Sequence, residues 1–144
     1  MVLVRPRRAP RDKCSRYARE VIQLDTSFLI RALLPDSTEA NRLRQWLEDR
    51  ESVGISALVW TEFQCGPVSS HVIAVTQRLL GEPLPFAGPE ADLSAKLFNE
   101  TGRRRGTLVD CMIAATAIVS EESLATSNPK DFARFEKFGL AIAT

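Results

Sequence analysis

The chain has 144 residues, of which 44% are hydrophobic and 26% are charged. These values are typical of a single globular domain and exclude a collagen-like, coiled-coil or wholly disordered protein. The formal net charge is +1, but residues 1–20 carry seven basic and two acidic side chains, whereas the remainder carries twelve basic and sixteen acidic ones. We therefore predict a flexible basic arm over residues 1–19, which either contacts nucleic acid electrostatically or is simply disordered, and a mildly acidic domain over residues 20–144.

From residue 20 onward, short apolar runs alternate with segments in which apolar residues recur every three or four positions. The apolar runs predict buried strands at 21–24, 53–58, 84–86, 124–126 and 140–143. The periodic segments predict helices at 28–34, 40–47 (capped by Asp36 or Ser37), 60–65, 69–80, 90–101, 108–120 and 131–137. Because the strands are apolar throughout, they predict a central, mostly parallel and twisted sheet with helices on both faces, which is a three-layer α/β/α fold.

Cysteine and histidine usage limits the kind of site that the domain can hold. Cys14, Cys65 and Cys111 are irregularly spaced, and His71 is the sole histidine, so a disulfide framework and a histidine-rich metal site are excluded. The longest apolar stretch, 108–119, is interrupted by Asp110 and is shorter than the roughly 20 residues that a membrane span needs. We expect a cytoplasmic protein with reduced thiols and no membrane contact.

Polar side chains that could form a site follow the predicted strands. Ligands bind beyond the carboxyl ends of strands in parallel α/β sheets. Asp25 follows the first strand, Glu62 lies one turn into the helix after the second, and Asn128 and Asp131 follow the strand at 124–126. Asp110 stands among apolar residues near the start of the preceding helix, where an unpaired charge is unfavourable. We therefore expect these five side chains to meet at one end of the sheet.

A group of carboxylates in one place requires a counter-charge, because like charges repel and burial strengthens the repulsion. Oxygen-only ligands select a hard divalent ion, either Mg²⁺ or Mn²⁺. A metal-bound water is a nucleophile near neutral pH, and the ion neutralises charge on a phosphoryl oxygen. The pattern therefore predicts hydrolysis of a phosphoryl ester without a covalent protein intermediate.

Each of these residues also has a purely structural interpretation. Asp25 could only cap a helix, Glu62 could lie on a helix surface, and Asn128 and Asp131 could shape a turn. A basic turn near the same end either holds substrate phosphates or is an exposed run of charge; it consists of Arg103, Arg104 and Arg105. The remaining acids of this region are expected on solvated faces; they are Glu100, Glu121 and Glu122.

Four segments resemble, in the same order, the four motifs of PIN domains. They read QLDTSFLI (23–30), ISALVWTEF (55–63), TLVDCMIAATA (107–117) and LATSNPKDF (124–132). The resemblance covers residues 20–144, and the compact length is similar to that of the VapC toxins of bacterial VapBC toxin–antitoxin pairs. Each motif is weak alone, but four with the proper spacing are specific.

The resemblance implies a Mg²⁺-dependent endoribonuclease toxin, with Mn²⁺ as a second possible ion, that is usually a homodimer and is held inactive by a VapB-like antitoxin. Asp25, Glu62 and Asp110 fall on the family's metal-binding acids. Many members have Asp where this sequence has Asn128; asparagine is a neutral ligand and weakens cation affinity unless Asp131 compensates. Thr26 and Ser27, together with Asn128, would steady the site.

Other interpretations stay open at this stage. The first is a non-catalytic PIN-like module that binds RNA or a protein partner. A phospho-acceptor receiver domain is disfavoured, because it would need paired acids near the first strand and a lysine after the last one. A group of apolar residues either forms the groove for the antitoxin or belongs to the core; they are Leu33, Leu34, Trp46, Trp60 and Phe63.

Overall fold

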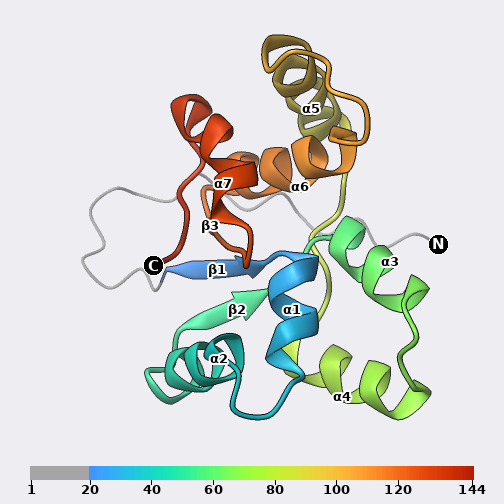
Figure 1. Ribbon diagram of the computed structural model, residues 1–144, viewed down its shortest axis with the longest axis vertical. Coiled ribbons are helices and arrows are strands. Elements are labelled where there is room, and N and C mark those ends of the chain that lie inside the picture. Colours follow the sequence, from blue (N-terminus) through green and yellow to red (C-terminus); the bar gives the residue numbers. More distant parts are fainter. Residues whose placement is uncertain (1–19) are drawn as a thin grey trace, which may run out of the picture.

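A computed structural model describes residues 20–144, and the basic arm expected over residues 1–19 lies outside the described residues (Figure 1). The strands are β1 (Val21–Leu24), β2 (Ser52–Gly54) and β3 (Ser123–Ala125). The helices are α1 (Thr26–Ala32), α2 (Thr38–Glu48), α3 (Ala57–Cys65), α4 (Ser70–Leu80), α5 (Gly88–Glu100), α6 (Leu108–Val119) and α7 (Pro129–Phe132), and a 3-10 helix, η1 (Ala133–Phe138), follows α7.

The three strands form one parallel sheet in the order β2-β1-β3. Ile22 of β1 is opposite Val53 of β2, and Gln23 is opposite Leu124 of β3. Helix α2 packs against β2 and helix α6 against β3, so the α/β architecture predicted from the sequence is confirmed. The arrows of β1 and β2 point the same way and end beside α1 (Figure 1). The carboxyl ends of the strands therefore share one edge, at which α1 begins.

Two predicted strands are shorter than expected, and one strand prediction extends into a helix. Residues 57 and 58 belong to α3, because the Ser56 hydroxyl accepts a hydrogen bond from the Val59 N–H at 3.2 Å and caps that helix. The predicted strands at 84–86 and 140–143 are reduced to single parallel bridges, from Leu84 to Ser56 and from Ile142 to Leu124. They extend the pairing beyond the named strands at both sides of the sheet.

The predicted helix at 131–137 begins earlier and changes its geometry. Pro129 starts α7, where its missing N–H costs nothing in the first turn. The chain then tightens into η1 until Gly139, whose φ of 102° is a conformation that glycine adopts without strain. This change turns the residues after Phe132 back toward the sheet, where Leu140 is buried.

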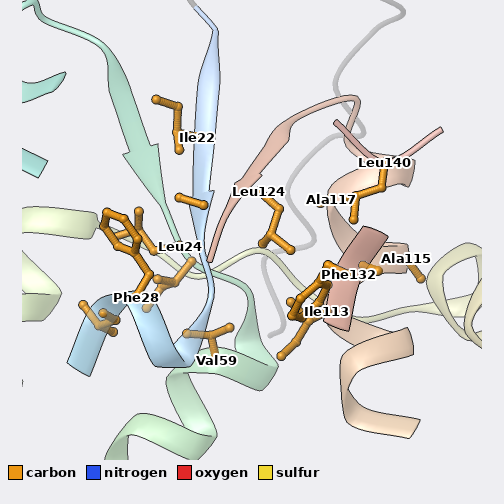
Figure 2. Close-up of a cluster of buried hydrophobic side chains, with 14 of the residues drawn as sticks. Ile22, Leu24, Phe28, Val59, Ile113, Ala115, Ala117, Leu124, Phe132 and Leu140 are labelled. Atoms are coloured by element: carbon orange, nitrogen blue, oxygen red, sulfur yellow. The ribbon is translucent and has the colours of Figure 1, made fainter. Parts of the chain in front are cut away.

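Apolar side chains from the sheet, from helices α1 to α7 and from η1 form one core, part of which is shown in Figure 2. Phe28 of α1 is fully buried and stacks on Trp46 of α2 at 5.4 Å between ring centroids. Phe63 is also fully buried, whereas Leu33 and Leu34 are exposed. Of the apolar group proposed as either groove or core, Phe63 therefore belongs to the core, and Trp46 and Trp60 are partly buried against it.

Two further findings concern charge and hydropathy. Glu122 is buried rather than solvated, and the Gln23 side chain of β1 donates a hydrogen bond to it, so the expectation for Glu122 was wrong. A buried carboxylate of this kind needs hydrogen-bond partners, which sequence patterns do not show.

Within residues 20–144, none of the helices is long and apolar enough to cross a membrane.

Candidate active site

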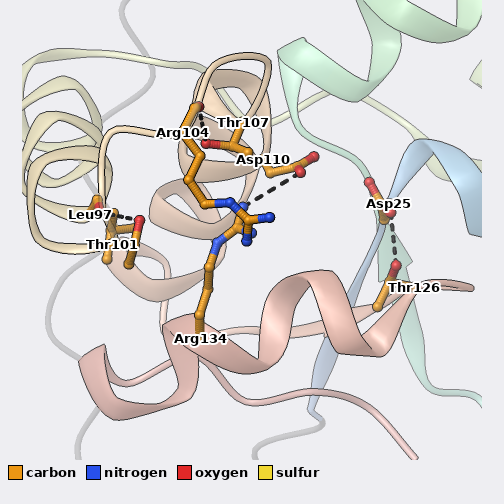
Figure 3. Close-up of polar contacts among 8 residues, drawn as sticks. All are labelled: Asp25, Leu97, Thr101, Arg104, Thr107, Asp110, Thr126 and Arg134. Carbon is orange, nitrogen blue, oxygen red and sulfur yellow. Dashed lines mark hydrogen bonds and ion pairs between the residues drawn. The ribbon is translucent and has the colours of Figure 1, made fainter.

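Asp25 stands at the carboxyl end of β1 and is almost completely buried. Its Oδ2 atom accepts hydrogen bonds from the Ser27 and Thr126 hydroxyls, each at 2.8 Å, and the second contact is visible in Figure 3. Although Asp25 occupies the cap position of α1, its side chain makes no capping hydrogen bond. The carboxylate is thus held by hydroxyls on one oxygen, and no hydrogen bond from the described residues reaches Oδ1.

Glu62 reaches the same edge from α3, on the exposed surface of that helix. The Thr26 hydroxyl donates to Glu62 Oε1 at 2.7 Å. Adjacent residues of α1 therefore hold two different acids, because Ser27 binds Asp25 while Thr26 binds Glu62. These are the contacts of the two residues that were expected to steady the site.

Asp110 lies in the first turn of α6 and is partly buried. Burial raises the pKa of its carboxyl group above the usual value, and the charge of Asp25 raises it further. Arg134 opposes this increase in the pKa, while Asp131 and Glu62 add to it. The charges of the three other acids therefore all act on the Asp110 carboxyl group.

Asn128 and Asp131 are both exposed, at the start of α7. The backbone N–H of Asn128 donates to the Thr126 hydroxyl at 3.0 Å, and its side chain makes no capping hydrogen bond. Asp131 contributes through its charge, as described for Asp110. Neither side chain is drawn into the hydrogen bonds around Asp25.

Three residues that sequence reasoning did not single out also shape the site. Thr126 binds Asp25, and Ser127 links the loop to α1 and α2 through its N–H to Ser27 (3.2 Å) and its hydroxyl to Glu39 (2.7 Å). The Ser127 hydroxyl holds the pKa of Glu39 below its usual value. Arg134 Nη2 lies 3.7 Å from Asp110 Oδ2. The sequence contains a signal for the Thr126 and Ser127 hydroxyls, because both residues directly follow strand β3.

The basic turn lies between α5 and α6 and is exposed. Arg103 has a φ of 51°, and the Thr107 hydroxyl donates to the Arg104 carbonyl at 2.7 Å just before α6 begins. In the view of Figure 3 the Arg104 side chain extends toward the side of α6 that carries Asp110. The turn is therefore exposed, and it directly precedes the helix that carries Asp110.

The chemistry of these donors fits a hard divalent cation, although the acids are not packed at chelating distance. Among residues 20–144, no three acidic, cysteine or histidine side chains gather closely enough to hold a metal by themselves. All the available donors are oxygens, and Mg²⁺ commonly keeps several of its waters and uses only one or two carboxylates. The free Oδ1 of Asp25 and the desolvated Asp110 are the donors that such an ion would find.

The fold and the acidic edge define the class of protein. The family model of the PIN domain matches residues 22–138, and the chain belongs to the PIN domain family. Among solved structures, a chain of VapBC2 from Rickettsia felis bound to a promoter DNA fragment matches with a TM-score of 0.69 and 23% identity, over 85% of this chain and 97% of that one.

Two further structures have slightly higher identity. A chain of FitAcB from Neisseria gonorrhoeae has a TM-score of 0.64 and 25% identity, over 85% of this chain and 96% of that one. A chain of a toxin–antitoxin complex from Klebsiella pneumoniae has a TM-score of 0.63 and 27% identity, over 78% of this chain and 90% of that one. No curated protein matches the chain. The chain is thus a PIN domain whose fold is similar to that of chains in these complexes.

Proposed function

We propose that this chain is a divalent-metal-dependent endoribonuclease toxin that hydrolyses RNA phosphodiester bonds. The observation that carries the proposal is geometric: adjacent residues of α1 bind Asp25 and Glu62 at the carboxyl end of β1, and the charges of both acids act on Asp110 in the first turn of α6. A set of mutually repelling carboxylates costs stability, and such clusters serve to bind cations. Their place, at the carboxyl ends of parallel strands, is where α/β folds bind ligands.

In this mechanism the chain's own residues position the charges. Asp25, Glu62 and Asp110 would hold Mg²⁺ or Mn²⁺, which when bound supplies a nucleophilic water near neutral pH and neutralises phosphoryl charge. Ser27 and Thr126 orient Asp25, and Thr26 orients Glu62, through the hydroxyl bonds described above. The exposed Arg103, Arg104 and Arg105 attract the RNA backbone, and Asn128 and Asp131, exposed at the start of α7, contact the substrate beside the acids.

A partner protein is part of the proposal. The solved structures that the chain resembles include some whose names describe them as toxin–antitoxin complexes or systems. We infer that a VapB-like antitoxin covers the acidic edge and the neighbouring apolar surface of α1, where Ile30, Leu33 and Leu34 are exposed. We also infer that the toxin acts as a homodimer in the cytoplasm.

The test is cleavage of total RNA by the purified full chain, with Mg²⁺, with Mn²⁺ and with EDTA, followed by mapping of the new ends. We expect cleavage with either ion and none with EDTA. Asp110→Asn should lower the rate at least about 100-fold, because it removes a charge that faces the ion. Asp92→Asn, an exposed change on α5, is the matched control and should cleave normally. Equal rates for the two variants, with equal circular dichroism, would refute the assignment.

One observation favours the alternative of a non-catalytic module that binds RNA or a protein. The acids within residues 20–144 do not approach chelating distance, and Asp110 already has a cationic neighbour in Arg134. This alternative predicts that RNA binds without being cut in Mg²⁺ or Mn²⁺, and that Asp110→Asn leaves binding unchanged. The same cleavage assay, combined with a filter-binding measurement, separates the two functions.

A further inference from the structure

Arg134 is the positive charge that counters the acids around Asp110. It lies on η1, and its Nη2 atom is 3.7 Å from Asp110 Oδ2. Among the charges that act on the Asp110 carboxyl, those of Asp25, Asp131 and Glu62 are unfavourable to its ionised form, and that of Arg134 is favourable. The arginine therefore already performs, within the described chain, part of the neutralisation that the acidic edge requires.

The guanidinium group is placed by packing rather than by a full set of hydrogen bonds. Its centre lies 4.6 Å from the centroid of the Phe135 ring, in a cation–π contact, and its side chain is 19% exposed. Nε and Nη2 are buried without a hydrogen-bond acceptor among the described residues. Because 3.7 Å is too long for a hydrogen bond, the contact with Asp110 is a loose ion pair that can separate without breaking one.

We propose that Arg134 is a built-in counter-cation that holds Asp110 in the metal-free protein and competes with the divalent ion for that carboxylate. This inference rests on the proposed function, since it assumes that a metal binds at the acidic edge. A guanidinium and a divalent cation repel each other, so both cannot be the close partner of one carboxylate. Arg134 then acts as a positioning residue that stabilises the empty site and lowers metal affinity.

The test measures metal binding and stability without RNA. Isothermal titration with Mg²⁺ and with Mn²⁺ should show that Arg134→Met binds each ion roughly tenfold more tightly than the unmodified chain, because one nearby positive charge is gone. In EDTA, the same variant should have a lower midpoint of thermal unfolding. Lys137→Met removes a charge from the same helix η1, but Lys137 is not among the charges that shift Asp110, so it should leave metal affinity unchanged.

Two more variants keep the result interpretable. Arg134→Lys retains the charge and should keep near-normal affinity, and Arg134→Gln retains a polar planar group if Arg134→Met does not fold. In an Asp110→Asn background, Arg134→Met should no longer tighten binding, because the shared carboxylate is absent. Equal or weaker metal binding by folded Arg134→Met or Arg134→Gln would overturn the inference alone. Failure of the unmodified chain to bind either ion would overturn the metal-dependent function, and the inference with it.

Discussion

Thr126→Val tests whether a single hydroxyl positions Asp25. The Thr126 side chain is 7% exposed, and its hydroxyl donates to Asp25 Oδ2 at 2.8 Å while it accepts from the Asn128 N–H at 3.0 Å. Valine fills nearly the same volume, so packing is retained and the hydrogen bonds are lost. A hydrogen bond to a charged group contributes about 1.5–3 kcal/mol. We expect the free energy of unfolding to fall by about 2 kcal/mol.

The assay pairs urea unfolding with RNA cleavage. Because Asp25 loses one of its two hydroxyl partners, its carboxylate can rotate, and the rate should fall by roughly 10- to 100-fold beyond any unfolded fraction. Thr116→Val is the matched control: Thr116 is also buried, but its hydroxyl donates to the Met112 carbonyl within α6, at 2.9 Å, rather than to an acid. Its loss should cost about 1 kcal/mol or less and leave cleavage intact. If the two variants have equal stability and equal rates, the positioning role is wrong.

Further predictions concern charge, metal and packing. The pKa of Asp110 is raised in the folded chain, so its contribution to the free energy of unfolding is greatest below its pKa in the unfolded chain and is lost as the pH rises through its pKa in the folded chain. Asp110→Asn should therefore unfold at a higher temperature than the unmodified chain at neutral pH. The difference should disappear in acid. The pKa of the Glu39 carboxyl is lowered in the folded chain, so Glu39 stabilises the fold above its pKa in the unfolded chain, and this stabilisation is lost as the pH falls through its pKa in the folded chain. Ser127→Ala should raise the pKa of Glu39, as an NMR titration can measure. Adding Mg²⁺ should raise the unfolding midpoint of the unmodified chain and not that of Asp25→Asn, as differential scanning fluorimetry can check. Phe28→Ala should cost about 3–5 kcal/mol in urea unfolding, because the ring is fully buried against Trp46.

Simple rules were enough to single out the acids of the candidate site from the sequence. Asp25 ends an apolar run, and a strand of that composition is central in a parallel sheet, so the residue after it lies at the ligand-binding edge. Asp110 is an acid within an apolar helix, a pattern that is costly without a compensating group. Both rules concern one residue and its immediate neighbours in the chain.

The contacts that complete the site depend on segments distant in the sequence, which local patterns do not connect. In the sequence Thr126 marks only the end of a predicted strand, but in the structure its hydroxyl donates to Asp25, which directly follows β1. In the sequence alone, Arg134 does not differ from the other basic residues. It reaches Asp110 of α6 only because the chain turns from α7 into η1. A predicted strand ended early because the Ser56 hydroxyl caps α3, and the apolar run alone does not show where a strand ends and a helix begins.

The bond between Thr126 and Asp25 spans almost the whole domain, since the two residues are 101 positions apart. The central strand β1 is also completed only when β3 pairs with it. Contacts of such long range form late, after the entropy of closing the intervening loop has been overcome. A polypeptide still being synthesised therefore lacks an assembled acidic edge until translation has passed residue 126, so any activity of this edge is delayed until the domain is nearly whole.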